Sequence, residues 1–301
     1  MVSTLGAEQR RSRRWGIFFK LLTFVYLFVL AVLFSGRWQT GSGAADYGVH
    51  TAAVDVYGVI ADKEDASAEV ILESLQDAFQ DEGSVAVMLR INSPGGSPVQ
   101  AGYVYDEIKR LRGLYPEKKV YAVISDIGAS GAYYIAAAAD EIYADKASLV
   151  GSIGVTASGF GFVDTLEKLG IERRVYTAGE HKSFLDPFSP EKPKEVEFWR
   201  SVLDNTHQQF INQVRMGRGD RLKEDDRMYS GLIWSGEQAL DLGLIDGLGA
   251  PEFVAREIVG AEKIVNYTIQ EDPFQRFAKS LGASMGASLH SLLMTNQVSL
   301  Q

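Results

Sequence analysis

The chain has 301 residues, of which 46% are hydrophobic and 23% charged, so it can form one large core or two modest ones. The first 36 residues hold five basic side chains and one acidic one; their charge of +4, within a total of −9, leaves −13 for the rest. This strongly negative net charge argues against nucleic-acid binding, because contacts to phosphates need clustered Lys and Arg. The lack of cysteine excludes disulfides and a thiolate nucleophile, and because the four histidines are scattered we expect neither a metal nor a cofactor.

The first predicted element is a membrane helix. Residues 15–34 are apolar apart from Lys20 and Thr23, and about 20 apolar residues are needed to cross the hydrocarbon core. We therefore predict a single-pass signal anchor over residues 15–36 that contacts membrane lipid. Basic residues before such a helix favour the cytoplasm, so residues 1–14 are expected on the cytoplasmic side of an inner or plasma membrane, with the body outside the cytoplasm.

Two other interpretations of this N-terminal segment compete with the signal anchor. A cleaved signal peptide also fits, because small residues follow the apolar core from Gly41 to Ala45. A twin-arginine export signal fits less well, since Gly16 occupies an apolar position expected after Arg13-Arg14. Residues 37–50 are rich in small and polar residues and are predicted to be a flexible linker.

The body alternates between β-branched runs and helical patterns, which is typical of a parallel α/β fold. We predict a folded domain over residues 51–260. Residues 194–216 place apolar side chains at helical spacing, which indicates one long amphipathic helix packed on the core. Residues 261–301 form a C-terminal extension whose role the sequence leaves open. The expected strands are 53–60, 85–91, 120–125, 141–144 and 173–177, and the expected helices between them include 68–80 and 99–114.

A Ser-Pro-Gly-Gly turn follows the second strand at residues 93–96. Two successive glycines allow backbone geometry that side chains forbid, so their N–H groups can point into a cleft and stabilise an oxyanion. An ordinary turn is the alternative, and for this motif alone it is the commoner outcome.

Ser130 stands among small residues, in Gly128-Ala129-Ser130-Gly131, between a strand and a helix. That position makes a serine hydroxyl accessible, as a nucleophile requires, and a helix N-terminus stabilises negative charge nearby. The alternative is that Ser130 only caps the helix, as serine commonly does.

A serine nucleophile needs a base, and Lys182 and His181 are both candidates. Lysine acts as a base only when neutral, which requires burial or nearby positive charge. A surface Lys182 paired with Asp186 is the alternative. A Ser-His pair is the commoner arrangement, and because adjacent side chains in an extended segment point opposite ways, only one of the two is expected to face Ser130.

Taken in order along the chain, these motifs resemble the signal peptide peptidase A family of serine proteases. The resemblance runs from about Val54 to Leu248, and several motifs in the right order are more specific than any one of them. The motifs are Arg90-Ile91-Asn92-Ser93-Pro94-Gly95-Gly96, Ala129-Ser130-Gly131-Ala132-Tyr133-Tyr134, Gly151-Ser152-Ile153-Gly154-Val155, Gly179-Glu180-His181-Lys182 and the closing segment 239–249.

The resemblance implies a role for four residues. Ser130 matches the family's nucleophile, Lys182 its general base and Gly96 the N–H donor to the oxyanion, which favours the lysine over His181. Ser152 matches a serine that orients the lysine amine. The implied fold is the Clp protease/crotonase type, an α/β superhelix of ββα units, here preceded by one transmembrane helix.

The chain departs from the family pattern at two positions. Ala132 stands where the family often has a second glycine after the nucleophile, and Ser97 stands where a third glycine is common. Both replacements are small, yet they could change the geometry of the cleft. The chain also resembles the single-domain form of the family, which implies a homo-oligomeric ring in which a partner protomer completes each site.

These observations predict a membrane-anchored serine endopeptidase with a Ser/Lys dyad. Its expected substrates are apolar peptides, such as released signal peptides, because a site near the membrane meets them first. Two rivals are a crotonase-like acyl-CoA enzyme on the same fold and a non-catalytic membrane scaffold. The membrane anchor and the Ser/Lys pair argue against the acyl-CoA enzyme.

Overall fold

The computed structural model describes residues 15–31, 47–223 and 225–269, and it divides the chain into two compact units. One unit is Met1–Tyr47 with Glu271–Gln301, and the other is Gly48–Gln270. In the first unit the described part is a helix over residues 15–31 whose side chains are nearly all exposed. Among the described residues no helix is both long and apolar enough to cross a membrane, so the anchor over 15–36 stays a prediction. The basic segment 1–14, residues 37–46 of the linker and residues 270–301 of the extension lie outside the described residues.

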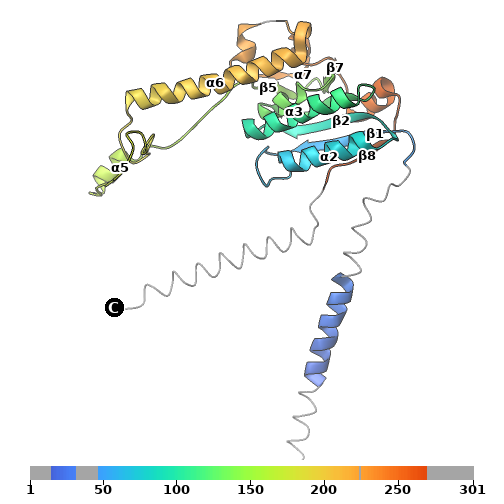
Figure 1. Ribbon diagram of the computed structural model, residues 1–301, viewed down its shortest axis with the longest axis horizontal. Coiled ribbons are helices and arrows are strands. Elements are labelled where there is room, and N and C mark those ends of the chain that lie inside the picture. Colours follow the sequence, from blue (N-terminus) through green and yellow to red (C-terminus); the bar gives the residue numbers. More distant parts are fainter. Residues whose placement is uncertain (1–14, 32–46, 224, 270–301) are drawn as a thin grey trace, which may run out of the picture. The chain divides into compact units, whose positions relative to one another are not determined.

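The second unit is built on one mixed sheet, shown in Figure 1. The strand order is β6-β5-β3-β2-β1-β8, with β4 beside β3 and β7 beside β4. Every pairing is parallel except that of β5 with β6. The strands are β1 (His50–Tyr57), β2 (Ser84–Ser93), β3 (Lys119–Ala129), β4 (Glu141–Ala144), β5 (Leu149–Gly151), β6 (Ile233–Ser235), β7 (Gly247–Leu248) and β8 (Ile264–Asn266).

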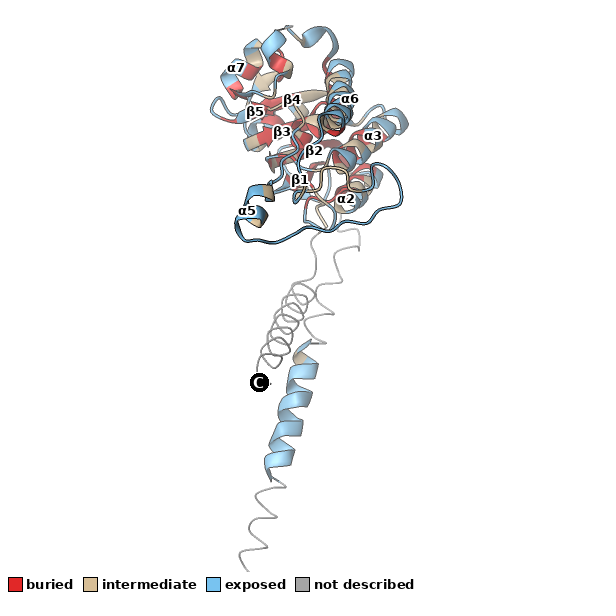
Figure 2. Ribbon diagram, turned by 90° about the vertical axis from the view of Figure 1, so that its left-hand side faces the viewer, coloured by how far each residue is buried: buried red, intermediate tan, exposed pale blue. Residues whose placement is uncertain are grey.

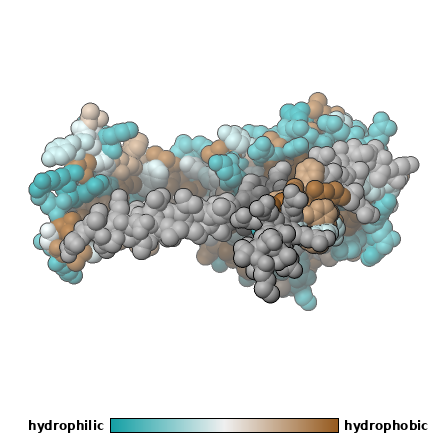
Figure 3. Space-filling view, turned by 90° about the horizontal axis from the view of Figure 1, so that it is seen from below, coloured by the Kyte–Doolittle hydropathy of each residue, from teal (hydrophilic) through white to brown (hydrophobic). Residues whose placement is uncertain are grey.

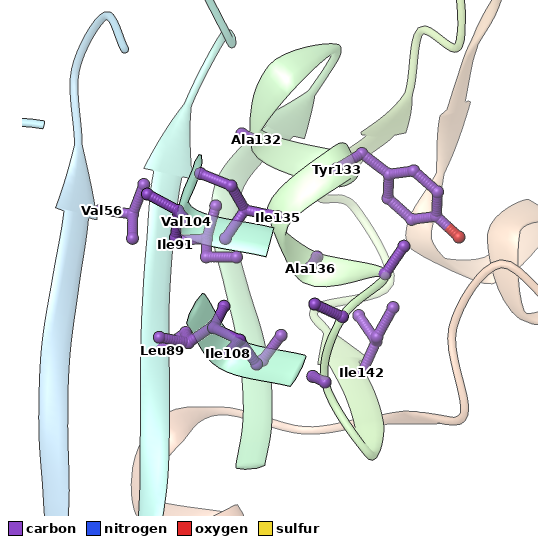
Figure 4. Close-up of a cluster of buried hydrophobic side chains, with 14 of the residues drawn as sticks. Val56, Leu89, Ile91, Val104, Ile108, Ala132, Tyr133, Ile135, Ala136 and Ile142 are labelled. Carbon is purple, nitrogen blue, oxygen red and sulfur yellow. The ribbon is translucent and has the colours of Figure 1, made fainter. Parts of the chain in front are cut away.

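Two clusters of buried side chains of unequal size pack on this sheet. Figure 2 shows the buried residues gathered around the strands. The larger core lies between the sheet and helices α2, α3 and α4, where Ile108 and Ile135 meet Leu89 and Ile91 of β2 (Figure 4). A smaller cluster on the other face packs Met88 and Tyr121 beneath Val254. The helices are α2 (Ala68–Gln80), α3 (Pro98–Leu114), α4 (Gly131–Ala136), α5 (Val163–Lys168), α6 (Pro193–Arg218), α7 (Gly236–Asp241), α8 (Pro251–Phe253) and the helical turns η2 (Gly219–Arg221), η3 (Asp226–Tyr229) and η4 (Val254–Val259).

The α/β alternation and the helices predicted at 68–80, 99–114 and 194–216 are confirmed, and so are four of the five strands. The strand expected at 173–177 is wrong, because this stretch is exposed and pairs with no described strand. Its apolar residues Val175 and Tyr176 lie next to Arg173 and Arg174, so it offers no apolar face to a sheet. The structure shows the mixed α/β sheet, whereas the Clp protease/crotonase superhelix of ββα units stays a prediction.

Only the C-terminal half of α6 packs on the core. Phe210, Val214 and Arg218 are buried there, whereas in the first half only Glu195 is buried. Figure 1 shows the helix projecting from the sheet, with the segment that carries α5 at its far end. We call residues 156–200 the arm.

Arg218 anchors α6 to the sheet through the closing segment. Its guanidinium is 1% exposed and donates to both carboxylate oxygens of Asp246, at 2.6 and 3.0 Å, and to the carbonyl of Gly243 at 2.9 and 3.0 Å. Asp246 also accepts the N–H of Ile142 in β4 at 2.7 Å. Burial raises the pKa of Asp246, but the hydrogen bonds and charge of Arg218 outweigh it, so the pKa lies below its ordinary value.

Replacing Arg218 with Met should lower the free energy of unfolding by about 3 kcal/mol, because it removes the buried cation beside Asp246 and the donors to the Gly243 carbonyl, and leaves the carboxylate only the more exposed Arg221, at 3.2 Å. Chemical denaturation of the variant at neutral pH checks this. A folded-state pKa below the unfolded one stabilises the fold at neutral pH and loses that effect as pH falls through the folded pKa. The difference between the variant and wild type should therefore shrink in acid.

Arg200→Met is the control, because Arg200 is exposed on the same helix. It should change stability by less than about 0.5 kcal/mol. Equal effects of the two substitutions would contradict the anchoring role of Arg218.

Candidate active site

The glycine turn after β2 lies directly against Ser130. A Cβ on Gly95 would stand 2.7 Å from the Cβ of Ser130, and one on Gly96 would stand 2.1 Å from the carbonyl oxygen of Ile60. The turn is fixed by hydrogen bonds from Ile60 N–H to the Gly95 carbonyl and from Ser97 N–H to the Ile60 carbonyl, at 2.9 and 2.7 Å. Neither of these two hydrogen bonds involves the N–H of Gly96. Its nitrogen lies 3.3 Å from the point where a Cβ of Gly131 would stand.

Ser130 occupies a strained turn between β3 and α4. Its φ of 52° and ψ of −124° are outside the conformations that residues with side chains prefer. Its N–H donates to the carbonyl of Gly151 at 2.8 Å and its carbonyl accepts from Tyr134 at 3.0 Å, so the backbone is held at both ends. The Ser130 side chain makes no capping hydrogen bond. The helix-capping interpretation is therefore wrong, and the hydroxyl is left for other chemistry.

Three of the four predicted site residues line one cleft of about 570 Å³: Gly96, Ser130 and Ser152. Ser152 follows β5, has a φ of 52° and is fixed by its N–H, which donates to the carbonyl of Leu232 at 2.8 Å. The remaining wall comes from α4, from α6 and from the loops beside them: Pro98, Gly131, Tyr134, Gly154, Val155, Thr156, Thr206, His207, Gln209, Phe210, Ser230 and Gly231.

The two departures from the family pattern lie next to residues of this cleft but do not line it themselves, since Ser97 stands between Gly96 and Pro98 and Ala132 follows Gly131. Ala132 is fully buried in the main core, as Figure 4 shows. Ser97 caps α3, where its hydroxyl accepts the N–H of Gln100 at 3.3 Å. Each replacement is therefore explained by packing or capping, and neither residue lines the cleft.

Lys182 is exposed on a turn of the arm and is not among the residues that line the cleft. The neighbouring His181 and Leu185 contact Glu195 near the start of α6, at 3.7 and 3.5 Å. The cleft begins eleven residues further along the same helix, at Thr206, which corresponds to about 16 Å at 1.5 Å per residue. Within one chain the structure therefore does not bring Lys182, or His181, to Ser130.

The pairing of Lys182 with Asp186 is not formed either. Asp186 instead pairs with Arg173 at 3.4 Å. Among the described residues, no three His, Cys, Asp or Glu side chains gather as metal ligands would.

Sequence reasoning missed the contributions of Tyr134, His207 and Phe210 to the cleft. Burial raises the pKa of Tyr134, so its phenol stays neutral and can donate a hydrogen bond. A ring nitrogen of His207, Nε2, lies 3.2 Å from the carbonyl oxygen of Ile153, next to Ser152. The helical spacing of Thr206 and Phe210 marks one face of α6, but it does not tell which cleft that face covers.

Comparison with known protein families matches residues 114–264, half of the chain, to peptidase family S49. A relative described as a putative protease, from Synechocystis sp., is 33% identical over 67% of this chain and 70% of its own length. A putative signal peptide peptidase SppA from Enterococcus faecium is 29% identical over 72% of this chain and 65% of its own length.

The chain is also similar to a Brucella abortus protein described as a Na(+)/H(+) antiporter, NhaA. The two are 46% identical over 62% of this chain, but the match covers 25% of the relative. The chain thus spans about a quarter of the length of that protein.

Ser130→Gly should be more stable than Ser130→Ala by about 1 kcal/mol, because glycine adopts the strained backbone of this turn without cost. Parallel denaturant titrations of the two variants test this. If alanine were as stable as glycine here, the turn would not be strained at Ser130.

Proposed function

This chain belongs to peptidase family S49, and from that premise we propose that it is a serine endopeptidase whose nucleophile is Ser130. The observation that carries the proposal is the cleft in which Ser130, Gly96 and Ser152 meet. The Ser130 hydroxyl is not used for capping, and the backbone that presents it is held by hydrogen bonds on both sides. A nucleophile needs this combination of accessibility and fixed position.

The proposed chemistry is acyl transfer to serine. Neutral Lys182 takes the proton of Ser130 as the hydroxyl oxygen attacks a peptide carbonyl, and the oxyanion is stabilised by the N–H of Gly96. The N–H of Gly131, at the start of α4 and on the same cleft, is a candidate second donor. The protonated Lys182 gives the proton taken from Ser130 to the nitrogen of the peptide bond as that bond breaks, and the new amino terminus leaves. Water then hydrolyses the acyl-enzyme, with the same lysine, neutral again, as base. Ser152 orients the lysine amine by a hydrogen bond.

Lys182 is proposed to act on Ser130 of a neighbouring protomer. Its turn lies about 16 Å along α6 from the cleft of its own chain, which is too far for one side chain to span. The arm that carries it exposes large apolar side chains, among them Phe160, Tyr176 and Phe198. Figure 3 shows apolar side chains among polar ones at the end where α5 lies. Burying them against another copy would assemble a homo-oligomeric ring and complete each site at the same time.

The proposed substrates are apolar peptides, such as signal peptide remnants. Val155 and Phe210 give the cleft an apolar wall beside Ser130, which suits small or apolar side chains. The proposed place is an inner or plasma membrane, with the helix over 15–31 as part of a single-pass anchor in lipid and the site outside the cytoplasm. The similarity to a relative described as a putative signal peptide peptidase supports the substrate class.

Gly96→Ala should lower kcat on a fluorogenic apolar peptide by roughly 100-fold, the usual cost of losing one oxyanion donor. The added methyl group would overlap the carbonyl of Ile60 and force the N–H of residue 96 to move. Gly102→Ala is the matched control, because a Cβ there has no neighbour within 4 Å. Gly102→Ala should behave as wild type, and a Gly96→Ala enzyme of normal kcat would contradict the assignment.

Mixing two inactive variants tests the intersubunit site. Ser130→Ala and Lys182→Ala should each lack activity, whereas rings reassembled from equal amounts of both should regain about a quarter of wild-type activity. One site in four would then combine an intact Ser130 with an intact Lys182 from its neighbour. A mixture of Ser130→Ala with wild type should keep half of wild-type activity whether or not subunits exchange, because every protomer carries an intact Lys182, so it is the control for the mixing procedure itself.

Three outcomes of this experiment contradict the proposal. Full peptidase activity of either single variant would remove the dyad. A wild-type chain without peptidase activity would leave the acyl-CoA enzyme or the scaffold as the better interpretation. Two inactive variants whose mixture stays inactive, although subunits exchange, would place the lysine and the serine in one chain.

A further inference from the structure

A buried carboxylate lies beneath the turn that carries Lys182. Glu195, in the first turn of α6, has a side chain only 7% exposed although the surrounding arm is open to solvent. Its Oε1 is 3.0 Å from Nζ of Lys192 and 3.7 Å from Nδ1 of His181. Its Oε2 accepts a long hydrogen bond, 3.5 Å, from the N–H of Leu185. The Lys192 hydrogen bond lowers the pKa of Glu195, burial opposes it, and the net shift is downward, so the group stays ionised.

Two of the arm residues that Glu195 contacts, His181 and Leu185, stand on either side of Lys182. His181 precedes it directly, and Leu185 ends the turn with a φ of 51°, a left-handed conformation that costs energy for a branched residue. Between them the backbone closes two successive turns, from Lys182 N–H to the Gly179 carbonyl at 3.2 Å and from Phe184 N–H to the His181 carbonyl at 3.1 Å.

Aromatic packing attaches the same turn to α6 on a second side. The ring of Phe184 lies 5.9 Å from that of Phe198 and 6.0 Å from that of Trp199, both in edge-on geometry. The Lys182 turn is thus held on α6 by the polar contacts of Glu195 and by the aromatic packing of Phe184. Lys182 is exposed, while its backbone N–H is held by the carbonyl of Gly179.

We propose that Glu195 is a positioning residue for the general base: it holds the Lys182 turn on α6, so that the amine reaches Ser130 of the neighbouring copy. The proposal rests on the proposed role of Lys182. A lysine side chain has four rotatable bonds, so the protein can place its amine reliably only by fixing the backbone from which it extends. A misplacement of about 1 Å at a reacting group can lower the rate by 100-fold. A merely local role, in which Glu195 stabilises the N-terminus of α6, would affect folding and not the chemical step.

The test compares Glu195→Ala, Glu195→Gln and Glu197→Ala in the full chain, on the fluorogenic apolar peptide. Glu195→Ala should lower kcat by about tenfold with KM unchanged, because substrate still binds the cleft while the base is misplaced. Glu195→Gln should recover most of kcat, since its amide oxygen still accepts from Leu185. Glu197→Ala should match wild type, because Glu197 is exposed on the same helix, two residues on. The melting temperature of each variant is measured alongside.

A double variant separates this proposal from the proposed function. The rate at which a serine-directed phosphonate labels Ser130 should fall in Lys182→Ala and fall no further in Lys182→Ala/Glu195→Ala. If Lys182→Ala keeps full activity, both proposals fail. If Lys182→Ala is inactive, three results overturn only the positioning role. These are a wild-type kcat of Glu195→Ala, a kcat of Glu195→Gln no higher than that of Glu195→Ala, and slower labelling of Ser130 in the double variant than in Lys182→Ala.

Discussion

The close approach of the Gly95-Gly96 turn to Ser130 is the contact on which the site depends. It follows from the parallel pairing of β2 with β3, whose register shifts near their ends so that Ser93 lies opposite Gly128. The turn after β2 and the strained turn after β3 then meet within contact distance, which only residues without a Cβ allow. β5 adds the third part, because the carbonyl of Gly151 fixes the backbone of Ser130 and brings Ser152 beside it. Three neighbouring strand ends thus place a hydroxyl, a free N–H and a second hydroxyl in one cleft.

The same fold separates the nucleophile from its proposed base. The core holds Ser130, while Lys182 sits on an arm that shares only α6 with that core. In the proposed mechanism this division makes activity conditional on assembly, because Lys182 then reaches Ser130 only from a neighbouring copy. Arg218 and Glu195 then have related roles on one helix: the first fixes α6 to the sheet, and the second fixes the Lys182 turn to α6.

Much of this architecture could be predicted from sequence, because it depends on local patterns. Alternating β-branched runs and helical periodicity predicted the sheet and α2, α3 and α6, and the position of Ser130 among small residues predicted an accessible hydroxyl. The strand expected at 173–177 failed because two apolar residues beside charged ones do not form a buried face. Whether Ser130 caps its helix, which residues of α6 wall the cleft, and how far Lys182 lies from it are all set by tertiary packing. No local pattern contains that information.

The central claim is that one active site is built from two copies of the chain, and a structure of the assembled full-length protein tests it most directly. The measured quantity is the distance from Lys182 Nζ to Ser130 Oγ. We predict that Nζ of one protomer lies about 3 Å from Oγ of its neighbour, within hydrogen-bond reach. A Lys182 amine in solvent in every protomer, or one folded back to Ser130 of its own chain, would contradict the account.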